Sequence, residues 1–473
     1  MKKLVILLFL LVSSLSAAGA ERAVSSDPRT MNFRPLSFEV PKAERQVLGN
    51  GMIVYLLEDR ELPIVTIQAY VPAGSIYDPP DKAGLALLTG AVLRGGGTSS
   101  TSAEKLDDEL EFMASSIESG IGPDSGTVSM SCLTKNLDRT LELFSQVMTA
   151  PAFREDRVEQ GRNRAVEAIR RQNDDPKDLA DRELRKAIYT GHPLGRFPTI
   201  PSINAITRAD LIAFHRRYFH PNGTILAVSG DFDKREMLAR LKKAFTGWKR
   251  EQPDLPAVQQ PSPSAKSGVY FVGRDIDQSV IRMGHLGIDK NNPDLYAVTV
   301  MNAILGGNGF SSRMMDQIRS REGLAYNAAS FFQAGRRFPG TFDAETETKA
   351  ATTVRTIGLM DEIIRDMTLK PVTGQELSLA KDSIINSFIF AFTNAASVVN
   401  HRARLEFYGY PEGYLENYRQ NVAKITREDV LRVARKYLRP EGMILVVVGD
   451  EKKFDKPLST LGKVTEIVPD NSK

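Results

Sequence analysis

The chain has 473 residues, of which 42% are hydrophobic and 25% charged, a composition typical of globular proteins with two or more domains. Its formal net charge is only +4, and basic residues are interleaved with acidic ones, so composition gives no reason to expect a nucleic-acid partner. The single cysteine, Cys132, cannot form an internal disulfide. Because it lies in the alternating run 127–133, we expect a buried structural thiol rather than a nucleophile.

Residues 1–20 have the pattern of a secretory signal peptide. Two lysines precede an apolar run from Leu4 to about Leu15, and Ala18-Gly19-Ala20 provides an A-x-A cleavage site. A membrane anchor is the alternative, but this run is shorter than the roughly 20 residues that a hydrocarbon core requires. No later stretch is long and apolar enough to span a bilayer. We therefore expect an exported protein, periplasmic or extracellular after cleavage, with no integral membrane segment.

Residues 249–267 have the composition of a linker. They contain four prolines together with Ser, Gln and charged residues, which disfavour helix and sheet. The segments on either side, 40–248 and 268–465, end in the same pattern, with each residue pair offset by 219 positions without a gap. The sequence therefore predicts two duplicated domains. The paired residues are Thr207 and Thr426, Asp210 and Asp429, Tyr218 and Tyr437, Pro221 and Pro440, Gly223 and Gly442, and Asp231 and Asp450.

Hydrophobic periodicity predicts runs of strands followed by runs of helices in each half, as in α+β domains with mostly antiparallel sheets. Strands 52–57 and 65–71 flank a polar tetrapeptide and are expected to form a hairpin. The other strands expected are 269–272, 278–286, 325–332 and 340–346. Helices are expected at 84–93, 103–117, 137–148, 155–173, 176–189, 295–304, 311–320, 353–367 and 374–392, and at the duplicated segments that begin at Thr207 and Thr426.

Several motifs together resemble one known family. They are Gly84-Leu85-Ala86, His192-Pro-Leu-Gly195-Arg196 and the segment Leu305-Gly-Gly-Asn-Gly-Phe-Ser-Ser-Arg313. With the duplicated helix, they make the chain similar to the pitrilysin and insulinase-type zinc peptidases, the inverzincins, from about residue 44 to 450. This family includes the mitochondrial processing peptidase. The resemblance implies two domains in a clam-like arrangement around a peptide-binding chamber.

The zinc site of that family is missing from this sequence. Active members carry H-x-x-E-H after the Gly-Leu-Ala segment, because two His one turn apart hold zinc while the Glu activates water. Here the two His positions are Leu87 and Ala91, and the Glu position is Gly90. The third ligand, a Glu separated from the second His position by 76 intervening residues, corresponds to Ala168. The neighbouring Glu167 points about 100° away on the helix and is expected to be solvated.

No other catalytic or metal-binding pattern replaces this site. An upstream Glu of the family falls on Gly161, and the five His lack the spacing of a zinc site. Neither a G-x-S-x-G elbow nor a phosphate-binding loop is present, so a non-metal hydrolase has no supporting residues. We expect no catalytic residues, metal or cofactor in this chain. The His residues are His192, His215, His220, His285 and His401.

The segment Arg319-Ser-Arg-Glu-Gly323-Leu-Ala-Tyr326 resembles the family's R-x6-Y element, which acts on substrate bound at the zinc of the opposite half or subunit. The resemblance implies that Arg319 and Tyr326 contact the substrate, with Arg321 a solvated neighbour. The sequence therefore favours a non-catalytic subunit of a heterodimeric exported peptidase, inactive alone, whose homologous partner carries zinc and hydrolyses extended peptides. The alternative is a non-enzymatic peptide-binding or scaffold protein, acting as a homodimer or monomer.

Overall fold

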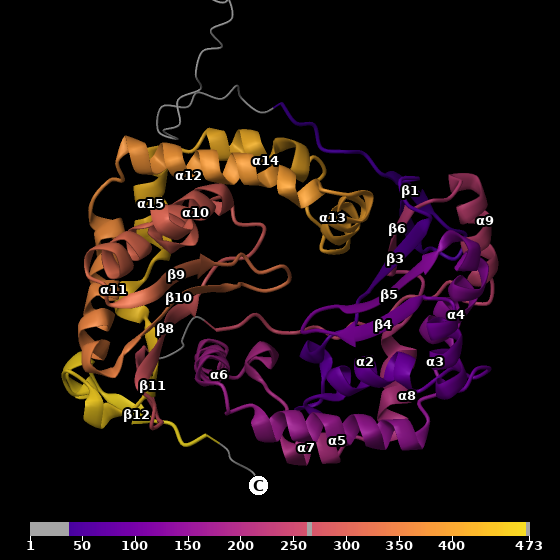
Figure 1. Cartoon of the computed structure of the whole chain (residues 1–473), viewed down its shortest axis with the longest axis horizontal. Coiled ribbons are helices and arrows are strands. Elements are labelled where there is room, and N and C mark those ends of the chain that lie inside the picture. The colour runs from indigo at the N-terminus through magenta and orange to yellow at the C-terminus, as the bar shows by residue number, and fades with distance from the viewer. Residues whose placement is uncertain (1–36, 263–266, 470–473) are drawn as a thin grey trace, which may run out of the picture. The chain divides into compact units, whose positions relative to one another are not determined.

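Two six-stranded sheets form the framework of the chain (Figure 1). The computed structural model describes residues 37–262 and 267–469, and the predicted signal peptide lies outside them. The first sheet has the order β1-β2-β6-β3-β5-β4 and the second β12-β7-β11-β8-β10-β9. The strands are β1 Glu44–Val47, β2 Ile53–Glu58, β3 Ile64–Val71, β4 Ser116–Ile121, β5 Gly126–Leu133, β6 Ile225–Gly230, β7 Gly268–Gly273, β8 Gln278–Leu286, β9 Ala325–Phe332, β10 Thr341–Lys349, β11 Ile444–Gly449 and β12 Val464–Glu466.

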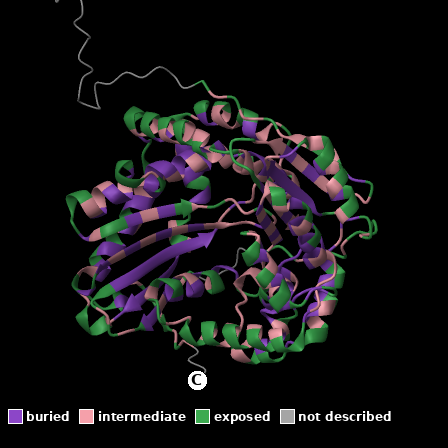
Figure 2. Cartoon of the chain, turned by 45° about the vertical axis from the view of Figure 1, so that its right-hand side comes forward, coloured by how far each residue is buried: buried purple, intermediate pink, exposed green. Residues whose placement is uncertain are grey.

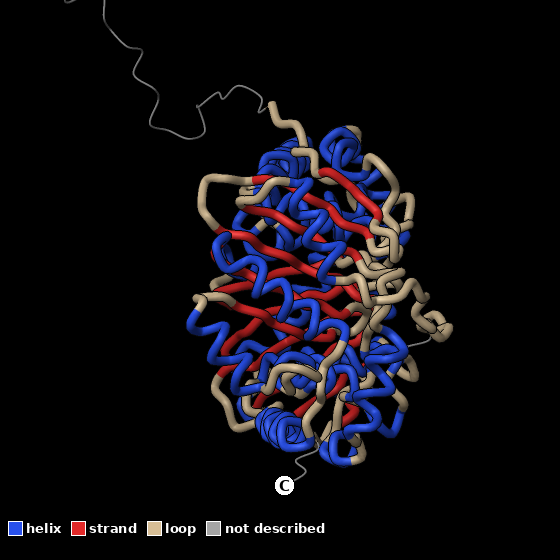
Figure 3. The backbone as a smooth tube through the Cα atoms, turned by 90° about the vertical axis from the view of Figure 1, so that its right-hand side faces the viewer, coloured by secondary structure: helices blue, strands red, loops and turns tan. Residues whose placement is uncertain are grey.

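Most strand pairs are antiparallel, and helices flank both sheets, which confirms the predicted α+β class. Figure 2 shows buried residues concentrated on the strands, and Figure 3 shows the strands running side by side between helices. The helices are α2 Leu85–Gly95, α3 Ala103–Phe112, α4 Leu137–Thr149, α5 Glu155–Arg171, α6 Pro176–Ile188, α7 Ile200–Asn204, α8 Arg208–Tyr218, α9 Lys234–Ala244, α10 Leu295–Asn302, α11 Thr353–Leu369, α12 Gly374–Ser387, α13 Ala395–Phe407, α14 Tyr414–Ala423 and α15 Arg427–Tyr437.

The predicted hairpin between the first two long strands is wrong. Strand β6 lies between β2 and β3, pairing in parallel with β2 and antiparallel with β3. The reason is the burial of β6: its residues 225–229 are all buried, so it occupies the centre of the sheet with a neighbour on each side. The polar segment after β2 therefore passes the end of β6 rather than forming a tight turn.

The helix predicted over 103–117 is too long. Helix α3 ends at Phe112, and Ile117 lies in β4, where it is buried. Ala114 follows the helix with φ of 47°, a left-handed conformation that a continuing helix does not contain. The apolar spacing of the segment is helical as far as Leu110, and the buried Ile117 belongs to the strand.

The two halves exchange equivalent helices. The offset of 219 residues relates α6 to α13, α8 to α15 and β6 to β11. Helix α6 packs on the second sheet, where Leu184 and Ile188 join Val280 and Val446 in one apolar cluster. Helix α13 packs on the first sheet, where Val399 and Ala403 join Ile225 and Ala227. Each half thus covers a face of the other's sheet.

The described part of the predicted linker, residues 249–262, contains no helix or strand. It is held by an ion pair between Arg217 and Asp254 at 2.8 Å. The His192 ring nitrogen Nε2 also lies 3.0 Å from the carbonyl oxygen of Gln259. The linker backbone therefore runs along the surface of the first half before the second sheet begins.

Across residues 37–262 and 267–469, no single helix is long and apolar enough to cross a membrane. One pair, Gly374–Phe392 with Ala395–Phe407, reaches the required length and composition together but is bent by 107°. The second member of this pair is α13, whose residues Val399 and Ala403 are buried against the first sheet.

Both duplicated helices begin with a reciprocal cap. The backbone N–H of Asp210 donates to the Thr207 hydroxyl, and the N–H of Thr207 donates to the Asp210 carboxylate at 2.8 Å. Thr426 and Asp429 form the same arrangement in α15. Such a capping box satisfies donors that a helix N-terminus otherwise leaves unpaired.

We predict that Thr207→Ala and Thr426→Ala each lower the free energy of unfolding by about 1 kcal/mol, because each loses the hydroxyl cap. Urea titration followed by circular dichroism measures the change. Thr207→Ser keeps the hydroxyl and should unfold within about 0.5 kcal/mol of the wild type. Equal stability of the alanine and serine variants would contradict the capping role.

Candidate functional site

Helix α2, which carries the positions of the absent zinc motif, is anchored by Asp78. The Asp78 carboxylate accepts the backbone N–H of Gly84 at 2.9 Å and of Ala86 at 3.0 Å. Only 5% of Asp78 is exposed, and this burial raises its pKa to about 7 against the opposing effect of the two hydrogen bonds. Gly84 has φ of 104°, which only glycine adopts readily, so the chain turns sharply into the helix.

The first two ligand positions are exposed and apolar. Leu87 and Ala91 lie one turn apart on α2 and line a surface pocket of about 480 Å³ together with residues of β4 and β5. Leu87 is 50% exposed. The side of the helix where the family would hold zinc thus offers methyl groups and no nitrogen or oxygen ligand.

The position of the catalytic base has no space for a side chain. A Cβ atom on Gly90 would lie 2.5 Å from the backbone nitrogen of Ile121. The Ser119 hydroxyl donates to the Gly90 carbonyl at 2.7 Å and accepts the backbone N–H of Arg94. Strand β4 therefore lies directly against α2, and its backbone fills the place where the Glu would begin.

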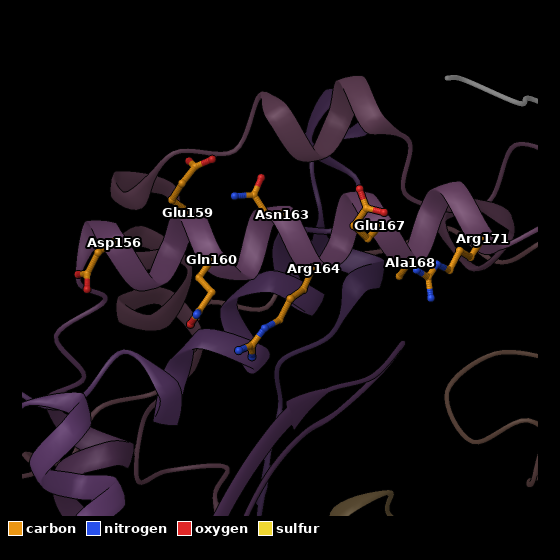
Figure 4. A pocket seen from close by; sticks show the side chains of 8 residues that line it. All are labelled: Asp156, Glu159, Gln160, Asn163, Arg164, Glu167, Ala168 and Arg171. Carbon is orange, nitrogen blue, oxygen red and sulfur yellow. The ribbon is translucent and has the colours of Figure 1, made fainter.

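The third ligand position also lacks a side chain that could bind a metal. Ala168 lies on α5 in a shallow surface hollow, and Figure 4 shows it on the same side of the helix as Gln160 and Arg164. Glu167 points with Glu159 and Asn163 to another side, and it pairs with Arg170. The residues present at the four family positions do not fit a zinc ion.

Gly161, the fifth position considered, lies at a close contact between α5 and α2. A Cβ atom there would meet Val92 and Leu88 at 2.8 and 2.9 Å. The absence of a side chain lets the two helices approach each other. The same substitutions that remove the zinc chemistry therefore also tighten the packing around α2.

No alternative metal site occurs in the part of the chain that the structure describes, where no group of three or more His, Cys, Asp or Glu side chains is suitably placed. The ring nitrogen Nε2 of His215 donates to the Met148 carbonyl at 2.9 Å, and Nδ1 of His285 donates to the Leu286 carbonyl at 3.0 Å. Burial lowers the pKa of each to about 4, so both are neutral core residues at pH 7. Cys132 is buried, and burial raises the pKa of its thiol to about 11, as expected of a structural thiol.

Arg319 and Tyr326 come together in the second half. Arg319 lies in a π-helical segment, Met315–Arg321, and Gly323 with φ of 62° turns the chain into β9. The Arg319 guanidinium carbon lies 4.3 Å from the centre of the Tyr326 ring. Arg321 instead pairs with Asp316 at 2.6 Å, with its side chain 70% exposed. The sequence-predicted pair thus forms one local unit, and Arg321 stays outside it.

A β-bulge directs Tyr326 outward. The pairing of β9 with β10 shifts register between Thr346 and Thr348, so that Tyr326 and Asn327 together face the single residue Glu347. Both residues of the bulge are exposed, and 83% of Tyr326 is accessible. Bulges and π-helical segments are both frequent at functional sites, because they direct side chains away from the regular pattern.

Phe310 is a member of this unit that motif reasoning missed. The centre of its ring lies 4.6 Å from the Arg319 guanidinium carbon, and the residue is 67% exposed. The signal in the sequence is an aromatic residue inside the glycine-rich segment 305–313, where a turn residue would be expected. Phe310, Arg319 and Tyr326 are called the aromatic–arginine stack below.

Comparison with known proteins gives two family matches. Residues 53–201 match the family described as insulinase (peptidase family M16), and residues 205–384 match the family described as the peptidase M16 inactive domain. The chain is 24% identical over 403 residues to the non-peptidase homolog YmxG of Helicobacter pylori, covering 84% of this chain and 91% of that protein. It is also 24% identical over 338 residues to an uncharacterized zinc protease of Streptomyces coelicolor, covering 70% and 72%.

Solved structures share the fold. The peptidase M16 inactive domain from Pseudomonas fluorescens superposes with a TM-score of 0.80 at 27% identity, covering 88% of this chain and all of that chain. A protease from Helicobacter pylori superposes with a TM-score of 0.77 at 20% identity, covering 87% and 100%. Proteins named as proteases and a protein named as a non-peptidase are thus both similar to this chain.

We predict that Gly90→Ala lowers the free energy of unfolding by about 1–3 kcal/mol, because the new methyl group meets the backbone of β4. Gly95→Ala in the same helix is the matched control, since a Cβ atom there meets nothing within 4 Å. In an open position of a helix, alanine should instead stabilise by up to about 1 kcal/mol. Thermal and urea unfolding compare the two variants, and a stabilising Gly90→Ala would contradict the close packing.

We also predict a pH dependence that arises from Asp78. Its folded pKa of about 7 lies above the unfolded value, so between about pH 4 and 7 the folded chain holds a proton that the unfolded chain releases. The free energy of unfolding contributed by this group therefore falls as the pH rises through that range. Asp78→Asn should flatten the slope measured by urea unfolding at several pH values. Asp81→Asn, at an exposed neighbouring carboxylate, should leave the slope unchanged.

Proposed function

Because the chain belongs to the M16 family of insulinase-type peptidases, we propose that it is a non-catalytic subunit that completes a zinc-bearing partner of the same fold. The matches of both halves confirm the family resemblance inferred from the motifs. In this proposal the partner supplies zinc and the activating base. This chain supplies half of the peptide-binding chamber together with Arg319 and Tyr326.

The observation that carries the proposal is a contrast between two sites in one chain. At the zinc positions every ligand is replaced, and Gly90 is closed off by the backbone of β4. The Arg319–Tyr326 pair is assembled in an exposed position by a π-helical segment and a bulge. The contrast supports a chain that contributes contacts to a substrate but no metal chemistry.

The chemistry of the pair suits a substrate held by another subunit. A guanidinium offers several N–H donors in one plane, and a phenol offers an O–H donor close by. Donors fixed in advance around a peptide carbonyl stabilise the negative charge that develops on its oxygen during hydrolysis. Neither group can activate water at neutral pH, so the pair assists a reaction whose nucleophile comes from the partner.

Export is part of the proposal. The pattern of residues 1–20 favours secretion, and a periplasmic or extracellular position would place the subunit with exported peptide substrates. Extended peptides are the expected substrates, because sheet edges such as β4 and β9 present backbone groups that can pair with an added strand.

A second function is a peptide-binding or scaffold protein without any catalytic partner. It is favoured by the similarity to the protein named a non-peptidase homolog, which extends over 84% of this chain. In this case the chain would act as a homodimer or monomer. Arg319 and Tyr326 would then bind peptides that are not cleaved.

We predict that the purified chain alone binds no stoichiometric zinc and cleaves no peptide, whereas mixing it with an H-x-x-E-H relative from the same genome restores hydrolysis of a fluorogenic peptide library. Arg319→Ala and Tyr326→Phe should lower kcat of the mixture about 10- to 1000-fold, as for the loss of an oxyanion donor. Arg321→Ala, a neighbouring arginine paired with Asp316, should have no effect.

Metal analysis and size-exclusion chromatography complete the test. Stoichiometric zinc in the isolated chain, or hydrolysis by it alone, would exclude the proposed division of labour. Peptide binding without formation of a complex with any zinc-bearing relative would favour the scaffold function instead.

A further inference from the structure

The aromatic–arginine stack brings two aromatic rings against one guanidinium. The guanidinium carbon of Arg319 lies 4.6 Å from the ring centre of Phe310 and 4.3 Å from that of Tyr326. Both rings are mostly exposed, at 67% and 83%. Each cation–π contact is favourable by itself, but two exposed rings on one cation hide no core surface. The arrangement therefore fixes the orientation of Arg319 more than it stabilises the fold.

The edge of Arg319 carries free donors. In residues 37–262 and 267–469 no carboxylate lies within ion-pairing distance of Arg319, and its side chain makes no hydrogen bond. The nearby acidic residues are occupied by other arginines: Asp316 pairs with Arg321, and Glu322 pairs with Arg355. The N–H donors of the Arg319 guanidinium are therefore available to a ligand.

The loop that carries Phe310 is fixed rather than loose. The Ser312 hydroxyl donates to the Gly309 carbonyl at 2.6 Å, and the Asn308 amide donates to the Ser311 hydroxyl at 2.7 Å. The Ser383 hydroxyl on α12 donates to the Asn308 side-chain oxygen at 2.5 Å. These bonds fix the backbone on both sides of Phe310, and the bond from Ser383 connects it to α12. Phe310 is thus held against Arg319 by its backbone and not only by its own contact.

We propose that Phe310 is a positioning residue that holds Arg319 in place, so that its N–H donors meet planar oxygen acceptors, a peptide carbonyl or a carboxylate. The inference rests on the proposed function, because it defines the ligand chemistry of the same site. It adds a third residue to that site. Bidentate contact in the guanidinium plane is the geometry in which arginine binds paired oxygens most strongly.

The test uses the complete mature chain and the side-chain Nε–H resonance of Arg319 in nitrogen-15 NMR spectra, assigned by its loss in Arg319→Lys. The probes are an acetylated alanine–glutamine decapeptide with a free carboxylate and the same peptide with a terminal amide. We expect both peptides or only the free acid to shift the Arg319 resonance. The first result identifies a backbone carbonyl as the acceptor, and the second identifies the terminal carboxylate.

Variants at Phe310 separate the effect of its aromatic ring on Arg319 from the effect of side-chain volume. Phe310→Ala should weaken decapeptide binding about two- to fivefold, the size of one exposed cation–π contact, and should move the Arg319 resonance before any peptide is added. Phe310→Tyr keeps the ring and should bind as the wild type. Phe310→Leu keeps bulk without a ring and should behave like Phe310→Ala. Phe112→Ala, which removes another highly exposed phenylalanine in the first half, is the matched control and should change nothing.

Several results would overturn the inference. These are a decapeptide affinity unchanged in Phe310→Ala, or no shift of the Arg319 resonance by either peptide. None of them depends on a partner subunit. A chain that passes this test but fails to activate any zinc-bearing relative would remove the proposed peptidase function and leave the role of Phe310 intact.

Discussion

Each sheet depends on the other half of the chain to cover its second face. The central strands β6 and β11 are buried almost along their whole length, so both faces of each sheet need apolar cover at its centre. Helices of the same half supply one face, and the exchanged helices α6 and α13 supply the other. Because the two helices are equivalent in the duplication, the exchange is reciprocal, and neither half can complete its core alone.

Both candidate sites lie at sheet edges. Helix α13 contacts β2, β6 and β3, and α6 contacts β8 and β11 and reaches β10 through the ion pair of Lys177 with Glu347. On β5 and β10 buried residues alternate with half-buried ones. The positions of the zinc motif lie beside the edge strand β4, and the aromatic–arginine stack lies at the edge strand β9.

The zinc positions on α2 lack ligand side chains, and the backbone around this helix is also closely packed. At Gly90 on α2, the backbone of β4 occupies the space that a side chain would need, and Ser119 joins the helix through two hydrogen bonds. Gly161 permits a similar approach of α5. A Glu at position 90 would thus overlap with the backbone of β4 in this arrangement.

The sequence by itself determined the duplication, the α+β class and the family, because these depend on periodicity and on residue identity at fixed spacing. Through the family resemblance it also indicated that Leu87, Gly90, Ala91 and Ala168 stand at the zinc positions. Only the tertiary structure decided that β6 separates β2 from β3, since strand order depends on long-range pairing. It also decided that Phe310 joins Arg319 and Tyr326, because a π-helical segment and a bulge change side-chain directions that regular periods predict.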